Sequence, residues 1–175
     1  MKKILKWVAI VFGGLVGLVV ALLFVIVLIS SSKMNQDFSD VRVVPINIPT
    51  DQASIDYGEH IFQSYGLCAE CHTDNAGGDN MGDDPIFGRL IASNLTAGKG
   101  GVGQTFQDID YLRAIRHGLG PDNKPLIIMP SQHFTKLSDR DVSTLIAYIK
   151  SVPTVDNELP KTKLGPLGRV IAMMA

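Results

Sequence analysis

Residues 66–72 read GLCAECH, and this stretch decides how the rest of the sequence is interpreted. Cys68 and Cys71 are the two cysteines of the whole chain, and His72 directly follows the second. Side chains three residues apart lie on the same face of a helix. The stretch therefore predicts two thiols held side by side, with an imidazole at the next position.

Four kinds of site use cysteines at this spacing. A disulfide here would close a very small loop, which stabilises little, and it would leave His72 without a role. A thioredoxin-like redox pair belongs to a βαβ setting, whereas this chain favours helices. A structural zinc site needs four ligands, but the other histidines, His60, His117 and His133, are scattered. We favour covalent haem c, which uses both thiols as thioethers and the histidine as an iron ligand.

A haem held by Cys68, Cys71 and His72 has a second axial position. A methionine sulfur there fills the position and raises the reduction potential. We expect Met129, which follows a predicted helix and turn and precedes Pro130, a residue that restricts the chain locally. The alternative role for Met129 is core filler beside two isoleucines. His133 is the next candidate for the ligand, ahead of His117, Met81, Met173 and Met174.

Amide and guanidinium groups are candidates for hydrogen bonds to haem propionates. Arg89 and Asn94 are the expected contacts, and Arg113 and Arg116 are further candidates. Arginines of this kind more often lie on solvated faces.

The front of the chain carries a run of 22 residues without a charge, at 8–29. A helix of that length reaches about 33 Å, enough for a hydrocarbon core of about 30 Å. Lys2, Lys3 and Lys6 precede the run, so the positive-inside rule places residues 1–7 in the cytoplasm. We expect an uncleaved transmembrane signal-anchor; the alternative is a long cleaved signal peptide.

The remainder of the chain is acidic. Four of the 16 basic residues lie within the first 33 positions and all 17 acidic residues follow them, so residues 34–175 carry a net charge of −5. Nucleic acid is therefore not an expected partner.

Beyond the anchor, residues 30–53 are polar and then punctuated by proline, which predicts a linker. Apolar periodicity predicts a helix over 54–64, another from about Thr105 to Gly118, and a third from the N-cap Ser138 to Pro153. Residues 73–103 are rich in Gly, Asp and Asn and are expected to be mostly loop. We therefore predict an all-α domain over 54–152, with three to five helices around one covalent haem and a tail over 153–175.

In its order of features the chain resembles a class I cytochrome c. A helix with Gly58 and Phe62 precedes CAECH, a Met-Pro pair follows, and a last helix carries LIAYIK. The pieces SNLT, GVG, MP and LSDRDVSTLIAYI are more closely similar to a haem module of the alcohol and gluconate dehydrogenase cytochrome subunits. The resemblance implies Met129 as the distal ligand. Those subunits usually carry three such modules, whereas this chain has one CxxCH.

These features lead to an expected function. A six-coordinate haem leaves no open position for a substrate, so we expect an electron carrier and not an enzyme. The expected place is the outer face of the cytoplasmic membrane, and the expected partners are the bilayer and membrane redox complexes. The linker would let the domain move between them. The alternatives are a fixed subunit of a respiratory or dehydrogenase complex, and a gas-binding or catalytic haem protein.

Overall fold

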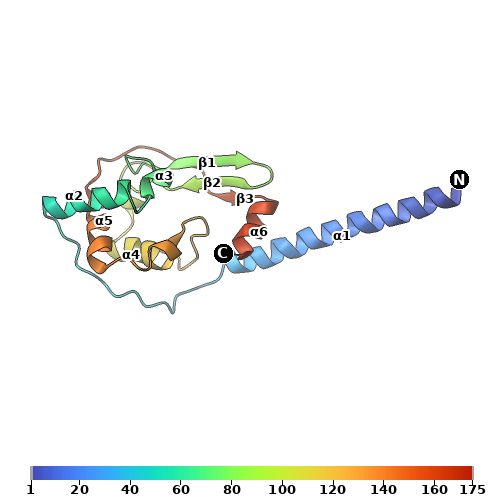
Figure 1. Ribbon diagram of the computed structural model, residues 1–175, viewed down its shortest axis with the longest axis horizontal. Helices are drawn as coiled ribbons and strands as arrows, with labels where there is room; N and C mark the ends of the chain where they lie inside the picture. The colour runs from blue at the N-terminus through green and yellow to red at the C-terminus, as the bar shows by residue number, and fades with distance from the viewer. Residues whose placement is uncertain (1, 175) are drawn as a thin grey trace.

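The computed structural model describes residues 2–174, which form a mostly helical domain carried on one long helix (Figure 1). The helices are α1 (Lys2–Met34), α2 (Gln52–Gln63), α3 (Cys68–His72), α4 (Asp108–His117), α5 (Asp139–Ser151) and α6 (Pro166–Met174). The strands are β1 (Asp79–Asp84), β2 (Gly88–Ala92) and β3 (Lys163–Leu164), and two short 3₁₀ turns are η1 (Val102–Gln104) and η2 (Ser131–His133).

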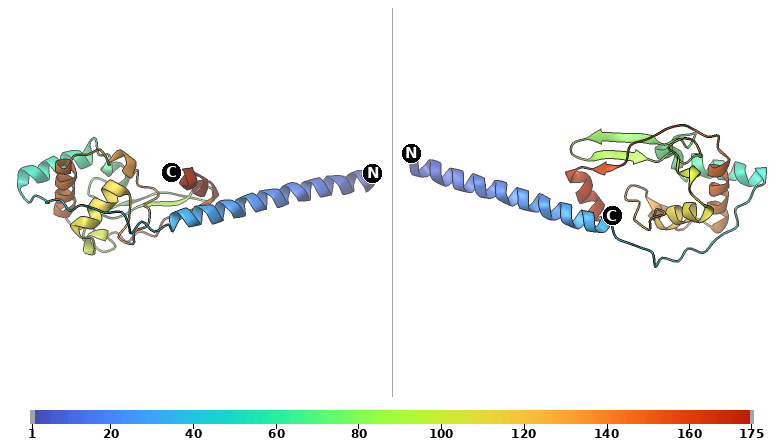
Figure 2. Two further views of the ribbon diagram at one scale, coloured as in Figure 1. Left: turned by 90° about the horizontal axis from the view of Figure 1, so that it is seen from below. Right: turned by 180° about the vertical axis from the view of Figure 1, so that it is seen from behind.

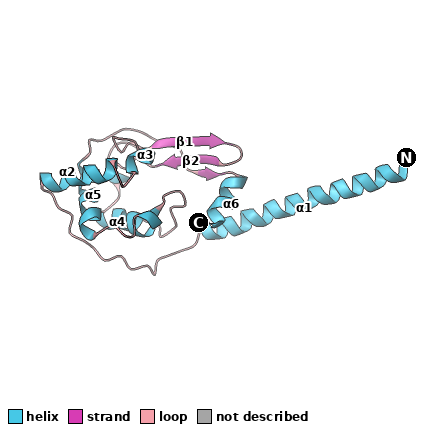
Figure 3. Cartoon of the chain, in the orientation of Figure 1, coloured by secondary structure: helices cyan, strands magenta, loops and turns pink. Residues whose placement is uncertain are grey.

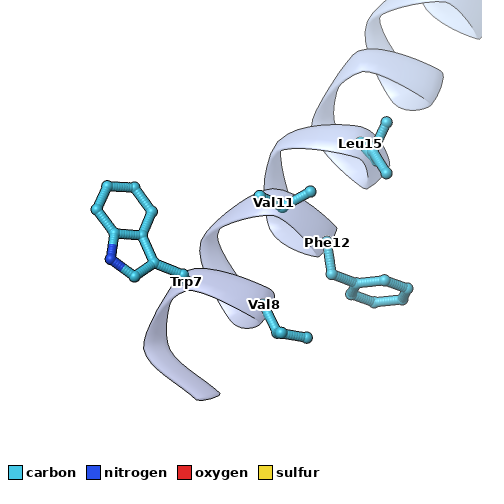
Figure 4. Close-up of a pocket in the computed structure, with 5 residues that line it drawn as sticks. All are labelled: Trp7, Val8, Val11, Phe12 and Leu15. Atoms are coloured by element: carbon cyan, nitrogen blue, oxygen red, sulfur yellow. The ribbon is translucent and has the colours of Figure 1, made fainter. Parts of the chain in front are cut away.

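The long helix α1 projects away from the domain. Figure 4 shows the side chains of Trp7, Val8, Val11, Phe12 and Leu15 pointing outward from it. Within residues 2–174 it is the one helix long and apolar enough to cross a membrane, and none of its most apolar stretch is buried. A core helix of a soluble protein would be covered, so this exposure fits a membrane anchor or a signal peptide.

The core lies where α2 crosses α5. Ile61 and Phe62 of α2 are fully buried, and every residue of α5 from Val142 to Ile149 is buried. The rings of Phe62 and Tyr148 meet with their centroids 5.3 Å apart. Burying a large apolar side chain stabilises a fold by about 1.5–3 kcal/mol, so this crossing carries much of the domain's stability.

Short polar residues define the helix ends. The Asp51 carboxylate accepts from the Ser54 amide at 3.0 Å, which caps α2. The predicted N-cap Ser138 is confirmed, since its hydroxyl accepts from the Asp141 amide at 3.1 Å. Gly118 ends α4 at a φ of +62°, in the left-handed region that favours glycine. The start of α4 was predicted wrongly: Val102–Gln104 forms a 3₁₀ turn, and α4 begins at Asp108.

The expectation of an all-α domain is wrong in one region. Residues 79–92, expected as loop, form the antiparallel hairpin β1–β2, and β3 pairs with β2 on its other side (Figure 3). The Asp84 carboxylate accepts from the amides of Ile86 and Phe87 at 2.8 Å each, which closes the hairpin turn. Asp, Asn and Gly are poor strand formers, so β1, with the sequence DNMGDD, gave no strand signal.

The segment predicted as a linker lies along the domain. After α1 ends at Met34, residues 36–50 contain neither helix nor strand. The Phe38 amide donates to the Asn123 carbonyl at 3.0 Å, and Val43, Ile46 and Ile48 pack against the core. These contacts attach the segment to the surface of the domain. It therefore allows a smaller range of movement than a free linker of the same length would.

Residues 153–174 of the segment predicted as a C-terminal tail pack first against the domain and then against α1. After α5 the chain passes Gly77 and Gly78, where the Asn157 side chain donates to the Gly77 carbonyl at 2.9 Å. It then adds β3 to the sheet and ends as α6, which packs against the last turns of α1 (Figure 2).

Candidate functional site

The CAECH sequence forms a single helical turn, α3, with left-handed residues on both sides. Leu67 before it has a φ of +50° and Thr73 after it a φ of +65°. Gly66 is required by close packing, because a Cβ there would lie 2.5 Å from the Ile61 carbonyl oxygen and 3.3 Å from the Cys68 sulfur. The end of α2 therefore leads directly into α3.

Both cysteines of α3 are free thiols. Burial, and to a smaller extent the neighbouring Cys71, raises the pKa of Cys68 to about 12. A thiol with so high a pKa supplies little thiolate for disulfide exchange. Within residues 2–174 no group of three or more His, Cys, Asp or Glu side chains gathers as a metal-ion site. The disulfide and zinc interpretations therefore lose support.

His72 is held in one orientation by a backbone carbonyl. Its Nδ1 lies 2.8 Å from the Ser93 oxygen. A carbonyl only accepts, so Nδ1 carries the proton and Nε2 keeps its lone pair. Burial lowers the pKa of His72, which favours the neutral ring. Histidines that bind metals commonly donate their other ring nitrogen to a carbonyl in this way.

Met129 lies in the segment after α4. The Leu126 amide donates to the Gly118 carbonyl at 2.6 Å, and the Met129 carbonyl accepts from the Ser131 amide at 2.8 Å. Met129 and Cys68 both pack, half-buried, against the same hydrophobic core. In Figure 1, α3 and the strands lie on one side of the domain, α4 and its following loop on the other, and α2 with α5 closes one end.

Apolar side chains on both of these sides are incompletely covered. Leu90 and Ile91 of β2 are half-buried, and so is the whole run 126–129. A folded domain ordinarily buries such a run. Two free thiols, a histidine with a free Nε2 and half-covered apolar residues together fit a haem. Cys68 and Cys71 would hold it covalently, His72 would bind its iron, and Met129 remains the predicted second ligand.

The other candidate ligands lie on the surface of the domain or in α6. Met81 is a solvent-exposed residue of β1, and Met173 lies in α6, where its carbonyl accepts from Lys33 at 2.6 Å. His117 and His133 are exposed at the ends of α4 and η2.

The predicted propionate contacts have protein partners. Arg89 pairs with Asp83 at 2.7 Å across the hairpin. Arg116 binds the carbonyls of Thr135 and Leu137 and the Asp139 carboxylate. Arg113 binds the Asn123 side chain, and its buried Nε lacks a partner among the described residues. A propionate role for any of these stays a prediction.

Asn94 has a structural role that the sequence did not reveal. It is almost fully buried, its amide donates to the Val155 carbonyl at 2.7 Å, and its carbonyl accepts from the Thr96 amide at 2.9 Å. These bonds join the segment after β2 to the segment after α5. They also fix the residue next to Ser93, whose carbonyl orients His72.

Replacing Asn94 with alanine is expected to lower the free energy of unfolding by about 2–3 kcal/mol, because buried amide and carbonyl groups lose their partners. Chemical denaturation of the haem-loaded protein, followed by circular dichroism, measures the change. Asn47→Ala is the matched control, since Asn47 is exposed in the segment before α2. Equal stability of the two variants would contradict the structural role.

Two comparisons with known proteins bear on this site. Residues 53–149 match the family described as "Cytochrome C oxidase, cbb3-type, subunit III". The chain is also 34% identical over 104 residues to the fructose dehydrogenase cytochrome subunit of Gluconobacter japonicus, a match covering 55% of this chain and 21% of that relative. The chain therefore spans about a fifth of the length of the relative it matches.

Proposed function

The chain belongs to the cytochrome c domain family described as cytochrome c oxidase, cbb3-type, subunit III, and from this premise we propose that it is a membrane-anchored carrier of single electrons. The family carries covalently bound haem c, and the single CxxCH at 68–72 provides for one. Electron transfer, and not catalysis by this domain, is the activity that this membership supports.

The observation that carries the proposal is the His72–Ser93 hydrogen bond beside two free thiols. We propose that Cys68 and Cys71 form the two thioethers and that His72 Nε2 and the Met129 sulfur are the iron ligands. Haem c supplies an iron that gains or loses one electron. With His72 and Met129 both binding the iron, the site would leave no position open to a substrate.

The surrounding residues would limit rearrangement and water. The Ser93 carbonyl keeps the imidazole in one tautomer, and the half-buried run at 126–129 would cover an apolar face of the cofactor. The surrounding dipoles and water would then need to reorient little when the iron gains or loses an electron.

The proposed location is the outer face of the cytoplasmic membrane. Lys2, Lys3 and Lys6 support a cytoplasmic N-terminus, with α1 crossing the bilayer once. An anchored domain is confined near other membrane redox complexes, which raises its effective concentration as their donor or acceptor. The domain boundaries at 30–53, 54–152 and 153–175 belong to the same proposal.

A second candidate is a fixed subunit of a dehydrogenase or respiratory complex. The relative from Gluconobacter japonicus is by its name a dehydrogenase subunit. In α1, Gly13 and Gly17 form a G-x-x-x-G pair with open space beside both, a pattern typical of close helix packing in membranes. The two candidates differ in whether α1 packs against lipid or against partner helices.

The test uses the full chain from a host that attaches haem. Its intact mass should exceed the chain mass by one haem, and its ferrous absorption spectrum should not change with carbon monoxide. An unmodified mass would overturn the covalent haem, and a carbon monoxide complex would favour a gas-binding or catalytic haem. Extraction in mild detergent then separates the remaining candidates: a carrier elutes alone, whereas a fixed subunit elutes with stoichiometric partners.

A further inference from the structure

Helix α6 is attached to the end of α1 by specific polar contacts. Arg169 Nη1 donates to the hydroxyls of Ser30 and Ser31, each at 3.1 Å, and Lys33 Nζ donates to the Met173 carbonyl at 2.6 Å. Ser30 is fully buried by this packing. The last helix of the domain is therefore held against the membrane helix itself.

The sequence of α1 indicates at which depth of the bilayer this contact between α1 and α6 would lie. Ser30 and Ser31 come directly after the uncharged run 8–29, and Lys33 is the first charge beyond that run. If α1 spans the bilayer, as the proposed function holds, then the run fills the hydrocarbon core and Ser30–Lys33 lie among the lipid headgroups. Helix α6 is placed at the same level.

The outward face of α6 is apolar. Leu167, Ile171 and Met174 are 39%, 51% and 82% exposed, and their spacing places them along one stripe of the helix. The residues that face the rest of the protein, Gly168 and Ala172, are buried. Helices on the surface of a soluble domain normally show the reverse arrangement, with polar residues outward.

The turn of the β1–β2 hairpin extends this apolar surface. Ile86 and Phe87 are largely exposed there. The Leu167 amide donates to the Ile86 carbonyl at 3.0 Å, so the turn and α6 are joined. At Gly168 a Cβ would lie 2.3 Å from the Phe87 carbonyl oxygen, which shows how closely they approach. In Figures 1 and 2 both elements lie on the side of the domain from which α1 projects.

The acidic residues beside the turn are already engaged. The Asp84 carboxylate accepts from the turn amides, and Asp83 is paired with Arg89 at 2.7 Å. The Asp83 charge is thus compensated by Arg89, whereas the Asp84 carboxylate keeps its charge and is held by the two amides of the turn. Lys33 and Arg169 at the base of α6 supply positive charge at headgroup level.

We propose that Ile86, Phe87, Leu167, Ile171 and Met174, here called the apolar rim, insert into the headgroup region of the outer leaflet. The occupant of this surface is lipid, continuous with the lipid around α1. With α1 and the rim both bound, the domain is held in one orientation on the membrane, instead of moving on a free linker. Redox partners would then approach the side of the domain that faces away from the rim.

The test measures thiol accessibility in the haem-loaded full chain in vesicles of phosphatidylcholine with a minority of phosphatidylglycerol. Haem occupies Cys68 and Cys71, so a cysteine introduced by Ile171→Cys or Ile86→Cys is the one reactive thiol. The rate with a charged, membrane-impermeant maleimide is divided by the rate with membrane-permeant N-ethylmaleimide. Thr50→Cys is the control, because Thr50 is exposed directly before α2, at the end of the domain away from α1.

We expect this rate ratio to be roughly tenfold lower for Ile171→Cys and Ile86→Cys than for Thr50→Cys, because the leaflet shields the rim. The Ile86 variant lies on a different element, so it tests the rim independently of α6. Equal ratios in a chain retained by the vesicles after alkaline washing would overturn the rim alone. Loss of the chain from washed vesicles would overturn the anchor, and the rim with it.

Discussion

Replacing Met129 with alanine is expected to open one coordination position of the haem iron. The ferrous protein should then bind carbon monoxide, which the unaltered protein should not. The reduction potential should fall by on the order of 0.1–0.3 V, because a sulfur ligand raises the potential and axial ligands set it over about 0.8 V. Absorption spectra with carbon monoxide and a redox titration measure both changes.

Two variants separate ligation from packing. Ile128→Ala removes a half-buried apolar side chain next to Met129 without removing a ligand, so it should leave the carbon monoxide result unchanged. His133→Ala tests the alternative ligand, which is exposed in η2. If His133→Ala opens the iron and Met129→Ala does not, the ligand assignment is wrong and Met129 is core filler.

The haem c motif could be recognised in the sequence because it depends on local spacing. Cys68, Cys71 and His72 lie within one five-residue turn of helix, and the cap at Ser138 and the end at Gly118 are likewise local features. The family match over residues 53–149 confirms the cytochrome c resemblance. A motif of five residues can be recognised without knowing how distant segments pack.

What the sequence did not reveal depends on contacts between distant segments. The carbonyl that orients His72 belongs to Ser93, and any residue type could supply it. Asn94 is bonded to Val155, far along the chain, and β3 completes a sheet whose first strand is acidic. Backbone partners carry no signature in residue type, so periodicity and composition could not predict them.

The position of α6 changes the role that we assign to residues 30–53, the segment before the domain. As a sequence, residues 30–53 suggested a tether that lets the haem domain move. In the structure this segment contacts the core through Val43, Ile46 and Ile48, while α6 binds the end of α1. The segment is thus held against the domain and α6 against α1, so the domain is less free to move relative to α1 than the sequence suggested.

The largest expected loss of stability comes from Gly58→Ala, at the crossing of α2 and α5. A Cβ at this position would lie 2.0 Å from the Thr144 carbonyl oxygen, 2.6 Å from its carbon and 2.9 Å from the Tyr148 Cβ. Two of these are backbone atoms of a buried helix, which cannot rotate away. The helices must separate, and the contact between Phe62 and Tyr148 is disturbed.

Helix propensity alone predicts the opposite sign for this change, because alanine is favoured over glycine inside a helix by about 1 kcal/mol. We expect steric overlap to dominate and to lower the free energy of unfolding by about 3 kcal/mol. For a domain of this size the midpoint of thermal unfolding should fall by more than about 10 °C. Thermal unfolding of the haem-loaded protein, followed by its circular dichroism, gives the value.

Gly82→Ala is the matched control, because Gly82 has no atom within 4 Å of the added Cβ. This variant should keep its midpoint, since it adds the same methyl group to an open position of β1. A Gly58→Ala protein as stable as the Gly82→Ala protein would mean that α2 and α5 cross farther apart than described.

The tight crossing matters to the cofactor as well, because α2 leads through Gly66 directly into the CAECH turn. A shift of α2 should therefore also change the haem absorption spectrum, whereas the Gly82 control should not.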